Sequence, residues 1–116
     1  MSESVQRFGV VVEAKPERLE EYKRLHANVW PEVRARMTEC HLRNFSIFGR
    51  RFPDGRYYLF SYYEYTGTDY AADMEKLAAD PKVQEWWDIT KPCHIPFPDR
   101  AEGEWWASME EMCYLP

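Results

Sequence analysis

The amino-acid sequence predicts an α+β fold of the ferredoxin-like type, with the element order βαββαβ and helices on one face of an antiparallel sheet. The first observation is a helical pattern of apolar residues at steps of three and four between residues 16 and 38. The second is a pair of aromatic-rich segments separated by a Pro-Asp-Gly turn. The third is the order of the remaining segments, with one strand before these elements, two helical stretches after them and a strand at the end.

The composition is that of a folded domain. The chain has 116 residues, of which 45% are hydrophobic and 30% charged, so we expect one domain over residues 1–116 with a core of its own. The net charge of -5 argues against a nucleic acid or an anionic membrane as partner. Aromatic residues make up 16% of the chain, more than a small core needs, which predicts a lined pocket or a large subunit interface.

The cysteine pattern and the N-terminal sequence predict a cytoplasmic protein. Cys40, Cys93 and Cys113 are odd in number and form no CxxC pair, which fits a reducing cytosol better than a disulfide framework. The sequence MSESVQRFGV carries an acidic residue and lacks the apolar core of a signal peptide. No segment approaches the roughly 20 apolar residues of a membrane span. We therefore expect a soluble, intracellular protein.

The first half of the chain predicts a strand over residues 7–14 and a helix over residues 16–38. The proline that opens this helix suits a first turn, and the acidic residues after it suit the positive end of the helix dipole. Pro31 does not fit an unbroken helix interior because it lacks the N–H donor. We expect a kink or a restart near Ala27-Asn28, with Asn28 as a possible N-cap.

Residues 42–49 and 56–65 predict the two strands of a hairpin. Both faces of the second strand carry aromatic side chains, so we expect one face to be covered by helices and the other by a partner or a ligand. Packing two sheets face to face would cover the outer face. The sequence therefore predicts a homodimer.

The second half of the chain carries two helix-start signals. Asp69 can cap one helix, and Asp80 followed by Pro81 can start another. The proline-rich stretch 91–104 predicts an ordered connection without regular structure. Residues 105–116 predict a final strand.

A tyrosine and a histidine share the apolar stripe of the first helix. Tyr22 and His26 are four residues apart, so their side chains are neighbours on one helix face. An imidazole that faces the interior beside a phenol is either a buried histidine bonded to a carbonyl or an acid/base group in a pocket. Its reference pKa of about 6.5 suits proton transfer near neutral pH. In the second case, the phenol would exchange a hydrogen bond with a polar ligand.

Two pairs of adjacent tryptophans add to the aromatic content. Trp86 and Trp87 point about 100° apart on a helix, so we expect one to pack and the other to line a site. A flat indole can stack on the C–H face of a sugar or on another ring, while core packing plus an interface contact is an equal alternative. Trp105 and Trp106 lie on a predicted strand, where neighbours face opposite sides, which favours core plus interface.

The sequence carries no recognisable metal or nucleotide motif. His26, His41 and His94 lie on different predicted elements, and Cys93-His94 is too short to chelate a metal comfortably. The five glycines form no GxGxxG, and no GxSxG is present. We expect no metal and no cofactor.

Several short motifs lie in order along nearly the whole chain. They are Tyr22 with His26, Trp30-Pro31-Glu32, Asn44, Trp86-Trp87 and the closing Tyr114-Leu115-Pro116. In this combination the chain resembles the L-rhamnose mutarotases, which are small dimeric α+β barrel proteins.

The resemblance implies an isomerase that interconverts the α and β anomers of L-rhamnose, a 6-deoxy-hexose, without a metal or a cofactor. In that family the histidine matching His26 is the proton donor, and the residues matching Tyr22, Trp86 and Trp87 contact the sugar. A further sugar-binding tyrosine is usual where this chain has Phe45, so one hydroxyl contact is missing. The residues after the histidine and after the tryptophans also depart from the family pattern, which makes L-fucose or a related deoxy sugar a competing substrate.

The implied chemistry is acid/base ring opening. A base removes the anomeric O–H proton while an acid protonates the ring oxygen, and one well-placed group contributes roughly 10²–10⁴-fold. Glu32 or a water molecule is a candidate for the second group. Two other classes of function stay open, namely a cofactor-free or haem-processing monooxygenase, by analogy of fold, and a non-catalytic small-molecule-binding dimeric module.

Overall fold

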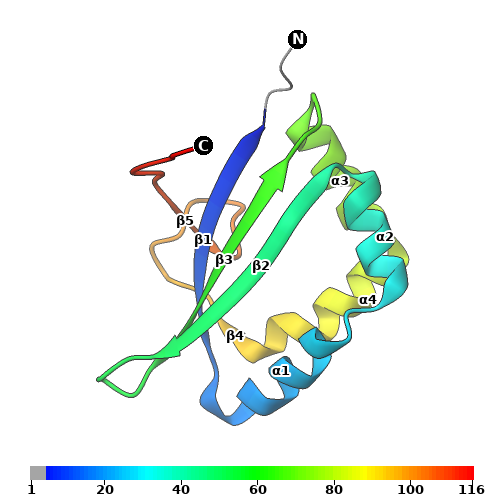
Figure 1. The fold of residues 1–116 in the computed structure, drawn as a ribbon. Helices are drawn as coiled ribbons and strands as arrows, with labels where there is room; N and C mark the ends of the chain where they lie inside the picture. The colour runs from blue at the N-terminus through cyan, green and yellow to red at the C-terminus, as the bar shows by residue number, and fades with distance from the viewer. Residues whose placement is uncertain (1–4) are drawn as a thin grey trace.

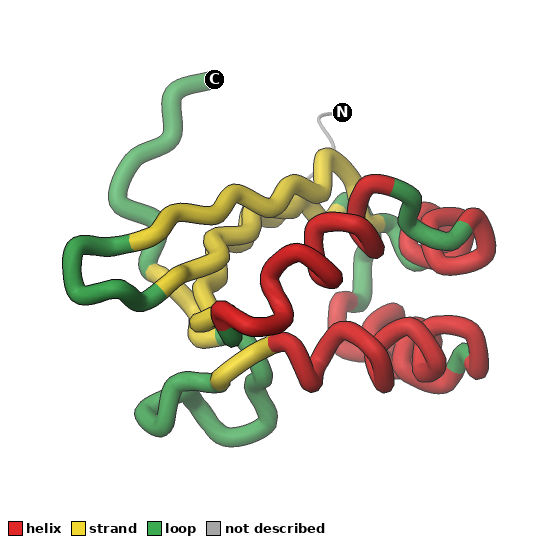
Figure 2. The backbone as a smooth tube through the Cα atoms, turned by 90° about the horizontal axis from the view of Figure 1, so that it is seen from below, coloured by secondary structure: helices red, strands yellow, loops and turns green. Residues whose placement is uncertain are grey.

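One curled antiparallel sheet forms one layer of the molecule, and four α-helices cover one of its faces (Figures 1 and 2). The computed structural model describes residues 5–116. The predicted α+β class, with its ferredoxin-like order of strands and helices, is confirmed. The strands are β1 (Gln6–Ala14), β2 (Leu42–Arg51), β3 (Tyr57–Tyr65), β4 (His94–Ile95) and β5 (Ala107–Met109). The helices are α1 (Leu19–Ala27), α2 (Pro31–Glu39), α3 (Tyr70–Ala79) and α4 (Pro81–Thr90), with 3₁₀ turns at Pro16–Arg18 and Lys91–Cys93.

The sheet has the order β2-β3-β1-β4, and β5 also pairs with β1. β1 is central because it pairs with β3 along its whole length on one side. On its other side, β4 pairs with Glu13 and Ala14, while β5 pairs with Gly9 to Val11. The final strand is therefore much shorter than residues 105–116, and the proline-rich stretch contributes a short strand that the sequence did not predict.

The long helical stretch is two helices, as the proline in its middle predicted. α1 ends at Ala27 and α2 begins at Pro31. Proline suits this first position because the N–H of a first helical residue makes no hydrogen bond within the helix. The prediction of Asn28 as an N-cap is wrong. Asn28 closes α1 through its backbone N–H, and Trp30 stands before α2 without a side-chain cap. His26 lies one residue before the end of α1, directly before this break.

The two aspartate caps of the second half are confirmed. The Asp69 carboxylate accepts a hydrogen bond from the Ala72 N–H at 3.1 Å and starts α3. The Asp80 carboxylate accepts from the Lys82 N–H at 2.8 Å, and Pro81 opens α4. Both caps satisfy N–H groups that the first turn of a helix leaves without partners.

The core lies between the sheet and the helices in two clusters. One centres on Val12, Leu59 and Tyr22, and the other on Val33 and Trp86. Burying such side chains contributes about 1.5–3 kcal/mol each. No helix within residues 5–116 is long and apolar enough to cross a membrane.

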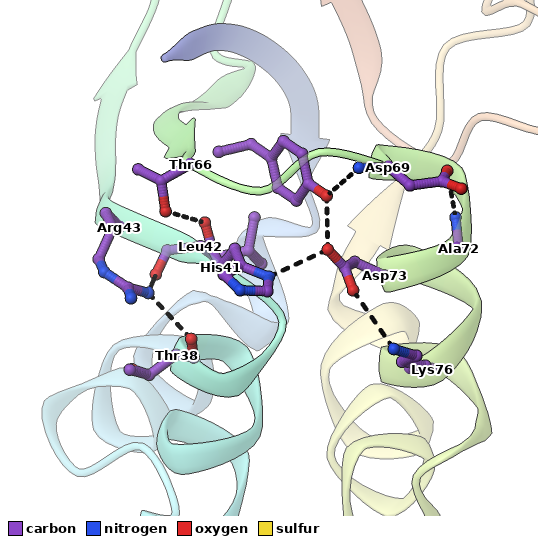
Figure 3. A network of polar contacts seen from close by, with 10 residues as sticks. Thr38, His41, Leu42, Arg43, Thr66, Asp69, Ala72, Asp73 and Lys76 are labelled. Atoms are coloured by element: carbon purple, nitrogen blue, oxygen red, sulfur yellow. Dashed lines mark hydrogen bonds and ion pairs between the residues drawn. The ribbon is translucent and has the colours of Figure 1, made fainter. Parts of the chain in front are cut away.

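A polar cluster fixes the start of β2 against α3 (Figure 3). The Asp73 carboxylate accepts hydrogen bonds from the Tyr65 hydroxyl and from Nδ1 of His41, the second at 3.0 Å. The Tyr65 hydroxyl in turn accepts from the Asp69 N–H at 3.0 Å. A bulge between Arg43 and Ser46 follows directly, with its backbone shifted out of register. The cluster anchors the strand that carries Phe45.

Candidate active site

A cavity of about 840 Å³ opens between the sheet and the helices. Its walls are mostly apolar and aromatic, with a few polar groups among them, which is typical of a small-molecule site. The structure brings all five site residues that the sequence analysis named to this one cavity. They are Tyr22, His26, Phe45, Trp86 and Trp87.

His26 lies in the last turn of α1, where the two core clusters meet. Its ring packs against Tyr22, with centroids 4.1 Å apart, and against the edge of Trp86 at 5.2 Å. Its Nδ1 lies 2.9 Å from the backbone carbonyl oxygen of Tyr22. Because a carbonyl oxygen only accepts, Nδ1 carries the proton in this contact. In the neutral imidazole, Nε2 is therefore the unprotonated nitrogen, a hydrogen-bond acceptor and a base.

Burial sets the protonation states of this pair. Desolvation lowers the pKa of His26 below its ordinary value, and the bond to the Tyr22 carbonyl opposes this in part. Desolvation also raises the pKa of the Tyr22 phenol. At neutral pH, the site thus holds a neutral imidazole with a free lone pair beside a neutral phenol.

Both adjacent tryptophans line the cavity, so they do not divide into one packing residue and one site residue as expected, although their burial differs. Trp86 is 6% exposed and packs edge-on against Trp30, with centroids 5.3 Å apart, while it also lines the cavity. Trp87 is less buried, and the Lys91 ammonium lies 5.0 Å from its ring centroid. Trp86 is held in place by core packing while it lines the cavity. Trp87 keeps part of its indole surface accessible, beside the Lys91 ammonium group.

Comparison with known proteins assigns the chain and its fold to a family. The sequence profile described as L-rhamnose mutarotase matches residues 7–115. The chain belongs to the L-rhamnose mutarotase family. A mutarotase interconverts the anomers of a sugar, so membership implies an enzyme of the isomerase class.

Individual mutarotase relatives cover nearly the whole chain. The L-rhamnose mutarotase of Listeria monocytogenes serovar 1/2a is 30% identical over 111 residues, which are 96% of this chain and 99% of the relative. A UPF0734 protein of Dictyostelium discoideum is 33% identical over an alignment of 101 residues, which covers 81% of this chain and 75% of the relative. The crystal structure of an L-rhamnose mutarotase from Formosa agariphila matches with a TM-score of 0.71 at 22% identity, covering 96% of this chain and 99% of that one. This structural match confirms the α+β barrel fold.

Phe45 stands at the position where the resemblance predicted a tyrosine. The side chain is 45% exposed, lines the cavity and stacks on Tyr63, with centroids 5.9 Å apart. The Tyr63 hydroxyl is 2.8 Å from the Tyr70 hydroxyl, so these two groups bond each other. Phe45 therefore presents an apolar edge at the cavity.

The cavity is also lined by residues that were not predicted from the sequence as site residues. Among them, His94, Trp105 and Trp106 line it from the proline-rich stretch and the approach to β5. His94 was considered only as a metal ligand, yet residues 5–116 contain no cluster of three His, Cys, Asp or Glu side chains that could hold a metal ion. Trp105 and Trp106 were predicted to lie in the core and at an interface. Glu32 lies exposed on α2 and outside the cavity lining, so it does not supply the second polar group.

Proposed function

We propose that this protein catalyses the interconversion of the α and β anomers of L-rhamnose, with His26 as the acid/base group. The observation that carries the proposal is the half-buried imidazole whose Nε2 is left as a base by the bond from Nδ1 to the Tyr22 carbonyl. It lines an aromatic-walled cavity in a member of the L-rhamnose mutarotase family. Nothing in this chemistry requires a metal or a cofactor.

The proposed reaction transfers a proton from O1 to O5, the two oxygens bonded to the anomeric carbon C1. Nε2 of His26 takes the proton of the anomeric hydroxyl, O1 forms a double bond to C1, and the C1–O5 bond breaks with its electron pair going to O5. The proton then passes from the imidazolium to O5. Since O1 and O5 are bonded to the same carbon, one imidazole can serve both. Rotation about C1–C2 and reversal of these steps give the other anomer.

The aromatic side chains are proposed to bind the sugar. A deoxy sugar has faces of C–H groups and one methyl group, and these suit the indoles of Trp86 and Trp87 and the ring of Phe45. The Tyr22 phenol stays neutral, so it can donate or accept a hydrogen bond at a sugar oxygen. Because Phe45 lacks the hydroxyl usual in the family, L-fucose is the competing substrate to test.

We also propose that the protein is a homodimer built on the outer face of the sheet. Phe48 pairs with Phe60 across β2 and β3 on this face, and it is 68% exposed. An exposed aromatic row on a sheet is typical of an interface. Light scattering of the wild-type protein should give twice the chain mass of 14.0 kDa, and the Phe48→Glu variant should give a mass closer to that of one chain. A monomeric wild type would contradict this arrangement.

Exchange NMR on the anomeric protons of L-rhamnose tests the proposed activity. The wild-type protein should speed the exchange between the α and β signals, and His26→Ala should lose most of this acceleration. Arg24→Ala is the matched control, because Arg24 lies on the same helix, is exposed and is outside the cavity lining. If the protein accelerated the anomer exchange of L-fucose more than that of L-rhamnose, L-fucose would be the preferred substrate. No acceleration of either sugar would disprove the function.

A further inference from the structure

His94 is held in one tautomer by its neighbour. The side chain is 5% exposed, and the indole Nε1–H of Trp105 lies 3.0 Å from its Nδ1. An indole nitrogen only donates, so Nδ1 of His94 is the acceptor and carries no proton. In the neutral imidazole, the proton is therefore on Nε2. His94 has the opposite tautomer to His26, whose proton is on Nδ1.

The Nε2–H of His94 lacks a partner. This atom is buried and has no hydrogen bond to any group within residues 5–116. The ring meets Tyr22 edge-on, with centroids 5.0 Å apart, and a ring face is only a weak acceptor. A buried donor without a partner is unfavourable, and native structures rarely keep one. His94 is also part of the cavity lining, so a ligand oxygen could satisfy Nε2–H if the neighbouring side chains move aside when the ligand binds.

We propose that His94 positions the sugar by donating a hydrogen bond from Nε2–H to one of its oxygens, an inference that rests on the proposed mutarotase function. His94 and His26 both contact the ring of Tyr22, and both line the same cavity. Two imidazoles of opposite tautomer thus belong to the lining of one cavity.

The donor has a defined use in ring opening. When the C1–O5 bond breaks, negative charge develops on O5, and a neutral N–H donor at that oxygen stabilises it. His94 keeps its proton throughout, and the proton that O5 finally receives comes from His26. Burial, the positive charge of a protonated His26 and that of Lys91 lower the pKa of His94 to about 4, so the neutral donor form persists over the working range of pH.

Imidazole ¹⁵N NMR of the wild-type protein tests the tautomer and its partner directly. His94 should show a protonated Nε2 and an unprotonated Nδ1 at pH 7.5, and saturating L-rhamnose should shift the Nε2 signal. Trp105→Phe removes the indole donor and should give a mixture of both tautomers. A protonated Nδ1 in the wild type, or an Nε2 signal that L-rhamnose leaves unmoved, would overturn the proposal.

Kinetics with two variants separate positioning from folding. His94→Leu removes the donor and should lower kcat/KM for L-rhamnose by about 3- to 10-fold, the range of one neutral hydrogen bond. His94→Gln keeps an N–H donor and should recover part of this loss. Equal activity of His94→Leu and wild type would refute a role of His94 at the sugar. A wild-type protein that accelerates no sugar would instead refute the proposed function itself, and with it the sugar as the partner of Nε2.

Discussion

The protonation of His26 gives the sharpest prediction, because the proposed reaction needs its neutral form. The bond from Nδ1 to the Tyr22 carbonyl leaves Nε2 as the base, and protonation of Nε2 removes this base. Burial lowers the pKa of His26 below its usual 6.5. We therefore expect kcat/KM for L-rhamnose to be constant above about pH 6.5 and to fall toward tenfold per pH unit on the acid side of the His26 pKa.

The size of the loss on removing this group follows from the same geometry. In His26→Asn the amide can still donate to the Tyr22 carbonyl, but no basic nitrogen remains at the place of Nε2. His26→Gln puts an amide near that place, and an amide is not a base at neutral pH. Both variants should therefore lose the 10²–10⁴-fold rate acceleration that a general acid/base group contributes. This factor equals about 2.7 to 5.4 kcal/mol of transition-state stabilisation.

Exchange NMR measures these quantities at equilibrium and needs no coupled enzyme. The rate of anomer exchange is recorded from pH 5 to 8, and the rate in buffer alone is subtracted at each pH. The fold of each variant is checked by the shifts of methyl groups in the core around Val12. A kcat/KM that rises as the pH falls below 6.5, or a His26→Asn variant within threefold of wild type, would refute the assignment of Nε2 as the base.

Three further predictions concern affinity and stability. Phe45→Tyr adds a hydroxyl at the cavity and should lower KM for L-rhamnose by about 3- to 10-fold, as exchange NMR at varied sugar concentration would show. Because the pKa of His94 is lowered to about 4 in the folded protein, the unfolded chain takes up a proton at this residue at a higher pH than the folded protein does. The free energy of unfolding should therefore fall by about 3 kcal/mol as the pH drops from 6.5 to 4. Urea titration should show a weaker pH dependence for His94→Gln. Val12 is fully buried, so Val12→Ala should lower the free energy of unfolding by about 2 kcal/mol, and an unchanged urea midpoint would contradict the packing described.

The elements that the sequence predicted well are those with local causes. Asp69 and Asp80 cap helices through N–H groups two or three residues away, so the signal lies within one turn. Pro31 marks the helix restart because its missing N–H excludes a helix interior. The end of the chain was predicted less well. Residues 105–116 predicted a strand, but only Ala107–Met109 pairs with β1. β4 pairs with Glu13 and Ala14 on the same edge, which limits the strand before Ala107 but does not explain its end at Met109.

The candidate site also contains residues that local sequence predicted and residues that it did not. Tyr22 and His26 are neighbours through helix periodicity alone, so the sequence was sufficient to pair them. Nothing in the sequence near His94 indicated its role. Its tautomer depends on Trp105, which lies eleven residues further on and reaches it across the turn of the proline-rich stretch. A contact of this kind follows from the path of a loop, which residue periodicity does not encode.

In the proposed reaction, the two imidazoles supply a base and a donor to one cavity without a buried charge. A charged pair such as lysine and glutamate would have to be desolvated among aromatic rings, at a cost of several kcal/mol for each ion. Two histidines avoid this, because burial favours the neutral form of each. A neutral imidazole is a base or a donor at Nε2 according to what its Nδ1 contacts. A backbone carbonyl at Nδ1 makes His26 the base, and an indole N–H at Nδ1 makes His94 the donor. The sugar is neutral and carries hydroxyls that both donate and accept, so it complements such a pair without any compensating charge.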